Sequence, residues 1–578
     1  AGEAFFSIPF DNAVTKSYYE VQNSGAANAT IYVLGSENYK IPAVLDGGVH
    51  KFLIPKSLSG AEQKVVFADE ANVIQVTSIK PVNQTGSFVN YLASNIEDVY
   101  LIISETSLMN EAQNYQSYRS SAQGGSNNTV LVDVNQLYGQ FGGGVRKHPL
   151  AIKRFLKEVY ETATIKPKAV FLLGKSIGNV GSQGSRLNAT AFEKNLVPSF
   201  GDPVADNYLT IGLVNPNSWV PDISVGRIAA NTPVEIAEYL TKVQAYENNQ
   251  DQNGFYDAET KEWQKQIIHF GGGANFNEQQ TFANRLNNYK GKIEGPDFGG
   301  TVYTYLQQSS EPINPVVLTE LNDLIANGAS LMTFYGHAVT DGFDINIDDP
   351  NNWGNFEKYP FVIGNSCYTG NIHKTSNNSV SESFVFAEDA GAIGMMSSVN
   401  LGFAYKLYEY TTNLYDQFST LGYGLSIGEQ AKNTSEVLYN TNPTDELKEQ
   451  TATQMTLHCD PLIKINYHEK PEIDMTAQSV FVTPEEIDLS IVNFDVNAVI
   501  TNLGRAINDS VNVELTRVYP NGNGDTTFFL KIPHLYYKDT ITFNVPLNAN
   551  LGIGLNEFQV RIDLPSFYEE QFDEFNNN

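Results

Sequence analysis

Short apolar runs alternate with segments of helical period from about residue 96 to residue 470. Residues 99–103, 130–134 and 169–174 are almost wholly apolar, as expected of strands that are buried on both faces. Before the third run, residues 149–160 place apolar side chains at helical spacing, with a proline in the first turn. Strands that alternate with helices predict a mostly parallel sheet covered by helices.

The same alternation returns further along the chain, after a predicted helix at 232–248. The elements expected there are strands at 266–270, 301–306, 329–335 and 360–366, and helices at 277–289, 315–327 and 380–390. This repetition predicts two α/β units in series, at residues 96–250 and 251–470.

The segment before these units has no helical period. Within residues 1–95, short alternating runs occur at 29–34, 51–54 and 72–76, and polar turns containing Gly and Asn separate them. This pattern predicts a small antiparallel β domain.

The segment after the two units, residues 471–578, also lacks helical period. Residues 487–491, 511–515 and 558–562 alternate between apolar and polar side chains, and turns rich in Asn and Asp lie between them. We expect an immunoglobulin-like β-sandwich without cysteines.

The charge of the chain limits its partners. Its 578 residues carry 65 acidic and 36 basic side chains, a formal charge of −29. This excess argues against binding to nucleic acid or to an anionic membrane surface. No run of about 18 apolar residues occurs, so no membrane-spanning segment is predicted. The chain begins at Ala1 without an initiator Met or an apolar leader, as a mature secreted chain would, and we expect an extracellular protein.

Two of the predicted strands end on reactive residues. Residues 331–335 lead into Gly336 and His337, and residues 361–365 lead into the segment that holds Cys367. The 25 residues between the two strands are enough for one parallel crossover. If the strands are neighbours, both side chains emerge at the same edge, where open α/β sheets place their reacting groups.

An imidazole beside a thiol at this edge would support nucleophilic catalysis. A nearby imidazole raises the thiolate fraction of a cysteine. The thiolate of Cys367 would attack a peptide carbonyl, and His337 would protonate the departing amine. The expected oxyanion donors are the backbone N–H groups of Ala338 and Cys367. Gly336 belongs to the same loop as Ala338. The alternative stays open, because a cysteine that ends a core strand is more often inert packing.

The segments around both residues resemble the gingipain family of cysteine peptidases, which are relatives of caspases. The matching segments are Phe334-Tyr335-Gly336-His337-Ala338, Ser366-Cys367-Tyr368-Thr369-Gly370 and Cys459-Asp460-Pro461-Leu462. The resemblance covers residues 96–470. It implies a caspase-like α/β catalytic unit of two subdomains with mostly parallel sheets, with Cys367 as nucleophile and His337 as its catalytic partner.

Two positions depart from the pattern of that family. Ala338 stands where the family has Gly. Residues 271–274 stand where the family has an acidic residue that orients the catalytic His, and Glu278 is the nearest acid. We consider Asp344 and Glu382 as candidates for orienting the His or for lining the site.

The second cysteine and the loop acids are not assigned to the catalytic pair. Cys459 replaces a structural Gly of the family and is interpreted as packing, and the adjacent His458 would point to the opposite face of a strand. The acids between Asp341 and Asp349 lack EF-hand spacing. We expect no cofactor to be required, and we leave open Ca²⁺ binding by these acids and the identity of any metal site.

Residues 137–155 are similar to PorU-type proteins, which are gingipain-fold sortases of the Bacteroidota type IX secretion system. The likeness implies a cysteine transpeptidase that cleaves C-terminal signals of exported proteins through an acyl-enzyme and passes the acyl group to a surface amine. Its partners would be those exported proteins and outer-membrane components of the secretion system, at the bacterial outer-membrane surface.

Residues 554–577 resemble the bacterial CARDB adhesion-type sandwich. Two alternatives are a secreted gingipain-like endopeptidase and a non-catalytic surface scaffold or binding component.

Overall fold

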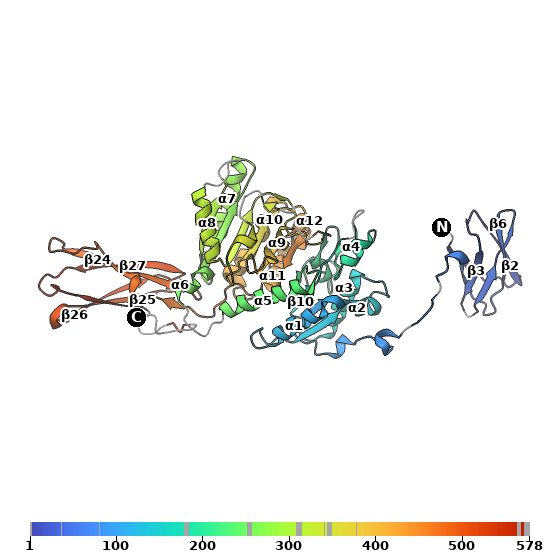
Figure 1. Ribbon diagram of the computed structural model, residues 1–578, viewed down its shortest axis with the longest axis horizontal. Coiled ribbons are helices and arrows are strands. Elements are labelled where there is room, and N and C mark those ends of the chain that lie inside the picture. The colour runs from blue at the N-terminus through green and yellow to red at the C-terminus, as the bar shows by residue number, and fades with distance from the viewer. Residues whose placement is uncertain are drawn as a thin grey trace. The chain divides into compact units, whose positions relative to one another are not determined.

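A computed structural model describes most of the chain (Figure 1). The described residues are 3–35, 37–74, 76–79, 81–178, 184–250, 257–307, 315–339, 342–343, 349–376, 379–562 and 568–570. The chain divides into two compact units, Ala1–Ser87 and Phe88–Asn578. The first unit therefore ends a few residues before the predicted boundary at residue 95. Within the described part, no helix has the length and apolar character that crossing a membrane requires.

The first unit contains two antiparallel sheets, in the orders β1-β7-β3-β4 and β2-β6-β5. The strands are β1 (Ala4–Ile8), β2 (Lys16–Gln22), β3 (Ala29–Leu34), β4 (Tyr39–Pro42), β5 (Val44–Asp46), β6 (Val49–Pro55) and β7 (Gln63–Asp69). Ile31, Phe52 and Phe67 belong to the core of this unit. The strand expected at 72–76 is wrong for residues 72–74, because Glu70–Asn72 form a 3₁₀ turn.

A four-stranded parallel sheet, in the order β13-β10-β8-β9, begins the second unit. Its strands and helices are β8 (Tyr100–Ser104), β9 (Thr129–Asp133), β10 (Ala169–Leu173), β13 (Ser224–Ile228), α1 (Met109–Ser120), α2 (Val134–Gln140), α3 (Pro149–Thr162), α4 (Ala189–Lys194) and α5 (Pro233–Gln250). Alternate residues of the central strands enter two separate cores, Tyr100 and Phe171 on one face and Leu101 and Leu172 on the other. Because α1 and α5 contribute to the first core and α2 and α3 to the second, both faces are covered, as predicted.

A six-stranded sheet follows, in the order β15-β14-β16-β19-β20-β21. Its strands are β14 (Gln266–Gly271), β15 (Thr301–Leu306), β16 (Leu331–Tyr335), β19 (Phe361–Asn365), β20 (Gly394–Ser398) and β21 (Met455–His458). The helices are α6 (Ala258–Lys261), α7 (Phe276–Ile293), α8 (Pro315–Asn327), α9 (Val380–Val385), α10 (Ala404–Asp416), α11 (Ile427–Thr441) and α12 (Glu446–Gln454). All pairs are parallel except β20 with β21. The mostly parallel sheets confirm the predicted α/β class, although the helix expected at 380–390 ends at Val385.

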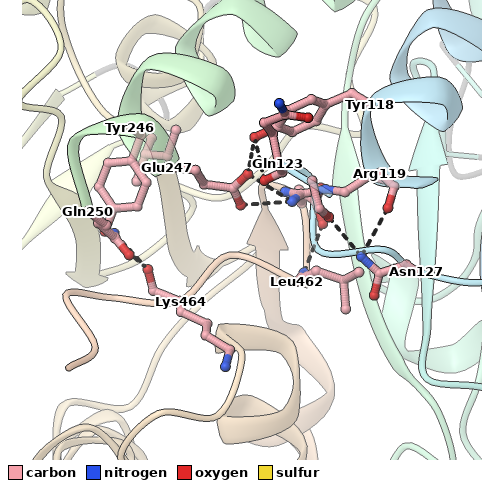
Figure 2. Close-up of polar contacts among 12 residues, drawn as sticks. Tyr118, Arg119, Gln123, Asn127, Tyr246, Glu247, Gln250, Leu462 and Lys464 are labelled. Atoms are coloured by element: carbon pink, nitrogen blue, oxygen red, sulfur yellow. Dashed lines mark hydrogen bonds and ion pairs between the residues drawn. The ribbon is translucent and has the colours of Figure 1, made fainter. Parts of the chain in front are cut away.

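A buried ionic cluster joins the two sheets. Arg119, at the end of α1, donates from Nε to Asp460 at 2.6 Å and from Nη1 to Glu247 at 2.7 Å, and Figure 2 shows its pairing with Glu247. Asp460 follows β21 and also accepts hydrogen bonds from the hydroxyls of Tyr100 at 2.7 Å and Tyr115 at 2.5 Å. The cluster therefore ties β8, α1 and α5 of the first sheet to the end of the second.

A second buried pair makes the stability of this unit depend on pH. Burial alone would raise the pKa of Asp206, but Arg227, which donates to it at 2.7 and 2.8 Å, lowers that pKa to about 2. Because this value lies below the usual 3.8, the stabilisation is fully present above about pH 4 and is lost as the pH falls through about 2. We expect Asp206→Asn to remove on the order of 2 kcal/mol of stability at neutral pH and to flatten the acid limb of the melting curve. The exposed Asp323, changed to Asn, is the matched control for these thermal melts.

The last part of the chain forms two further antiparallel sheets. One contains β22-β24-β23 with β27 paired to β24, and the other has the order β26-β25-β28. The strands are β22 (Ile473–Asp474), β23 (Val480–Thr483), β24 (Asn493–Asn502), β25 (Val511–Val518), β26 (Asp525–Ile532), β27 (Lys538–Pro546) and β28 (Glu557–Ile562). Val496, Val513 and Phe543 belong to one core shared by both sheets. The strand expected at 487–491 is wrong, because residues 489–490 form a turn, the other three have no regular structure, and β24 begins at Asn493.

Candidate active site

His337 and Cys367 lie at the same edge of the six-stranded sheet. β16 and β19 are parallel neighbours, and Tyr335 at the end of β16 pairs with Asn365 at the end of β19. Each reactive residue follows its strand end by two positions. The N–H of Gly336 donates to the carbonyl of Asn365 at 3.3 Å, so the two connections are still linked beyond the strands. The two strands are therefore parallel neighbours, as expected, and both residues follow their ends at one edge.

The thiol of Cys367 is half-buried and makes no disulfide. Its Sγ accepts a hydrogen bond from the backbone N–H of Gly402 at 3.4 Å and lies 3.7 Å from the carbonyl oxygen of the same residue. A protonated thiol can donate to the carbonyl and accept from the N–H, whereas a thiolate can only accept from the N–H. The N–H contact holds the sulfur against the backbone of Gly402.

The turn that carries Cys367 is fastened to the segment after β20. Tyr368 has a φ of 62°, in the left-handed region, and its N–H donates to the carbonyl of Asn400 at 2.9 Å. The N–H of Gly370 donates to Ser398 at 3.0 Å. A Cβ on Gly370 would lie 2.4 Å from the carbonyl oxygen of Ser397, so this close approach requires glycine. The sulfur is therefore held on a fixed turn rather than on a free loop.

Glu278 is the acid that contacts His337. Its Oε2 lies 3.1 Å from Nε2 of His337, and it also accepts the N–H of Ala274 at 2.9 Å. Asn275 caps α7 through the N–H of Glu278 at 3.1 Å, and the ring of Phe282 packs edge-on against His337 at 6.1 Å. The hydrogen bond from His337, followed by that from Ala274, lowers the pKa of Glu278. Glu278 is thus an ionised carboxylate that can hold the imidazole in one orientation.

The two acids named as candidates from the sequence differ in what the structure describes of them. Asp344 lies outside the described residues. Glu382 is buried in α9, where it completes the capping box with Ser379 and pairs with Lys175. Burial raises the pKa of Glu382, and the ammonium of Lys175 opposes that rise. The interpretation of Glu382 as an orienting residue is corrected accordingly, because its carboxylate serves the packing of α9.

Ala338 lies directly after the imidazole, in a short hairpin. β17 (Ala338–Val339) pairs with β18 (Gly342–Phe343), and Phe343 stacks on Phe334 of β16 at 4.1 Å. The hairpin places Ala338 beside the end of β16, next to Gly336. The roles of the Ala338 and Cys367 N–H groups as oxyanion donors stay predictions.

The second cysteine packs in the core. Cys459 is fully buried, and burial raises the pKa of its thiol well above the usual value. The neighbouring His458 has separate partners, since its Nε2 accepts the N–H of Ala229 at 3.1 Å and its Nδ1 lies 2.8 Å from the hydroxyl of Ser381. This arrangement confirms that Cys459 and His458 do not form a second catalytic pair.

No group of three or more His, Cys, Asp and Glu side chains that could hold a metal ion occurs among the residues that the structure describes. Asp341, Asp344 and Asp348 lie outside those residues, so Ca²⁺ binding by this loop stays a prediction.

Comparison with known proteins gives the following similarities. A family model described as peptidase family C25 matches residues 94–466, more than half of the chain. The chain is similar to the complex of the pro- and mature domains of RgpB from Porphyromonas gingivalis, with 14% identity, 80% of this chain and 99% of that chain covered, and a TM-score of 0.48. It is similar to dimeric latent PorU from the same organism, with 13% identity, 97% of this chain but 50% of that chain covered, and a TM-score of 0.41. No curated protein sequence matches.

The matched region contains the whole of both α/β sheets and the edge that carries the reactive residues. His337, Glu278 and Cys367 all lie within it. The chain therefore belongs to peptidase family C25, the gingipain family of cysteine peptidases.

Proposed function

We propose that this protein cleaves peptide bonds with Cys367 as nucleophile and His337 as general base and acid. The observation that supports this most strongly is the pairing of β16 with β19, which brings Cys367 to the edge where Glu278 contacts His337. His337 accepts the thiol proton, and the sulfur attacks the substrate carbonyl carbon. When the tetrahedral intermediate collapses, the C–N bond breaks, the amine leaves with the proton from His337, and an acyl-enzyme thioester forms.

Glu278 acts in this proposal by fixing the ring of His337. We expect Glu278→Gln to lower kcat by about 10²-fold with little change in KM, because the amide keeps the shape but no longer stabilises the imidazolium. The measurement is steady-state cleavage of a peptide reporter. Glu294→Gln, at the far end of α7, is the matched control. Equal activity of the two variants would assign the orienting role to another residue.

The finer proposal is that the acyl-enzyme is passed to an amine rather than to water. The protein would then act as a type IX secretion sortase at the bacterial outer-membrane surface, on exported proteins with C-terminal signals and together with outer-membrane components of the secretion system. The support for this role is the likeness of residues 137–155 to PorU-type sequences. Attack of the amine nitrogen on the thioester carbon forms an amide and releases the Cys367 thiol.

The fate of the acyl group separates the sortase from its rivals. Incubation with a peptide substrate and a primary amine, followed by mass spectrometry, should give the amine-linked product in addition to the hydrolysis product. Hydrolysis alone at saturating amine would favour the secreted endopeptidase. Neither product would favour a non-catalytic scaffold or binding component, and Cys367→Ala would then leave the cellular role intact. The scaffold alternative rested on Ala338 and on the glycines at 271–273, and the contact of Glu278 with His337 weighs against the second of these grounds.

A further inference from the structure

Three large, exposed apolar side chains lie on the segment that follows β20 and whose Gly402 contacts the sulfur. Leu401 is 55% exposed, Phe403 41% and Tyr405 50%. They flank Gly402, whose backbone N–H and carbonyl lie 3.4 and 3.7 Å from the Sγ of Cys367. Segment 401–405 therefore presents three apolar surfaces to solvent next to the nucleophile, where a substrate must pass.

The backbone of this segment is held from several directions. The hydroxyl of Tyr335, at the end of β16, donates to the carbonyl of Ala404, and Arg285 of α7 donates to the same hydroxyl. On the other side, the carbonyl of Asn400 accepts from Tyr368 at 2.9 Å and from the hydroxyl of Ser398 at 3.1 Å. Because both strand ends that carry the catalytic pair also fix segment 401–405, its apolar side chains keep a defined position relative to the sulfur.

Segment 401–405 offers a cationic substrate side chain no carboxylate of its own. Residues 399–405 contain no acidic side chain. Two basic side chains have partners of their own. Arg285 contacts the hydroxyl of Tyr335, and Lys406 pairs with Asp445 at 2.7 Å and with Glu409 at 3.2 Å. On the imidazole side, the buried Phe282 packs against His337, and the carboxylate of Glu278 lies on the same ring.

We infer that segment 401–405 determines specificity by binding a bulky apolar side chain of the peptide, on a residue adjacent to the scissile bond. The inference rests on the proposed cysteine peptidase function. Contact with Leu401, Phe403 and Tyr405 removes apolar surface of both partners from water while the carbonyl is presented to Cys367. A charged side chain at the same position would lose hydration without gaining a partner on this segment.

The direct test compares peptide reporters that differ only at the residue before or after the cleaved bond. We expect reporters with Phe or Leu at one of these positions to exceed those with Arg, Lys, Asp or Gly by about tenfold or more in kcat/KM. Phe403→Ser and Leu401→Ser should each reduce this preference by about tenfold, while the Gly reporter changes little. Leu421→Ser, which removes a 72% exposed leucine after α10, is the matched control. A preference for Arg or Lys, or variants that keep the apolar preference, would overturn the inference.

Covalent inhibitors separate failure of this inference from failure of the proposed function. Acyloxymethyl ketones with a Phe or an Arg side chain alkylate a nucleophilic cysteine without turnover, and the mass shift on Cys367 gives the rate. Faster labelling by the Phe compound, reduced in Phe403→Ser, supports the inference even if every reporter is cleaved slowly. Equal labelling by both compounds contradicts the inference and leaves the nucleophile established. If neither compound nor iodoacetamide labels Cys367 faster than Cys459, the proposed function fails and this inference fails with it.

Discussion

Replacing Cys367 with alanine is expected to lower kcat for peptide cleavage by about 10³-fold or more, because the acyl-enzyme route is lost entirely. The melting temperature should change little, since the side chain is half-buried and its two contacts are with the backbone of one residue. Steady-state cleavage and a thermal melt of the same preparation measure both quantities.

The matched control is the same substitution at the other cysteine. Cys459→Ala removes a fully buried thiol from the core, so it should lower the stability by about 1 kcal/mol and leave kcat essentially unchanged. The two variants should thus show opposite patterns of activity and stability. Cleavage by the Cys367→Ala variant at the parent rate would mean that another residue is the nucleophile.

Replacing Arg119 with methionine is expected to destabilise the α/β region by about 3–5 kcal/mol. Methionine fills much of the same volume, but it leaves the fully buried carboxylate of Asp460 without its cation. The hydroxyls of Tyr100 and Tyr115 would still donate to Asp460, so the lost energy reports the guanidinium specifically. Glu247 would lose the same partner.

Hydrogen exchange in α1 and α5 during urea unfolding measures this effect locally, which is necessary because a chain of several domains need not unfold in one step. Arg154→Met is the control, since Arg154 lies on the exposed face of α3 and makes one hydrogen bond to the carbonyl of Phe141. If both variants exchange alike, the cluster around Arg119, whose pairing with Glu247 is drawn in Figure 2, does not hold the two sheets together.

The sheets were predictable because buried parallel strands leave a direct signal. Runs such as β10 and β16 are apolar at nearly every position, and the structure buries all of their residues. Helices α1 and α12 have much weaker amphipathic patterns and bury several polar side chains, so periodicity could not find them. The alternation at 487–491 failed for a different reason, because alternation alone does not show that a segment has a partner strand.

The placement of the two reactive residues at one sheet edge was predictable from the sequence, but the contact of Glu278 with His337 was not. His337 and Cys367 each follow the end of a strand, and the parallel pairing of those two strands brings both residues to the same edge. The point at which α7 begins, after the three glycines at 271–273, decides which carboxylate reaches His337. The spacing of residues in the sequence does not give that point. The one available signal was the capping pattern of Asn275 followed three residues later by Glu278. Glu382 was misinterpreted because its own capping box and Lys175 use its carboxylate.

The most direct test of the central claim is the reactivity of Cys367 toward limiting iodoacetamide across a mildly acidic to neutral pH series. Mass spectrometry of the folded protein would quantify labelling at Cys367, with the buried Cys459 as internal reference. We predict fast labelling of Cys367 that persists at about pH 6 and is lost in His337→Ala, because the thiolate depends on the imidazole. Labelling of Cys367 no faster than that of Cys459, or unaffected by His337→Ala, would contradict the assignment of this pair as the catalytic centre.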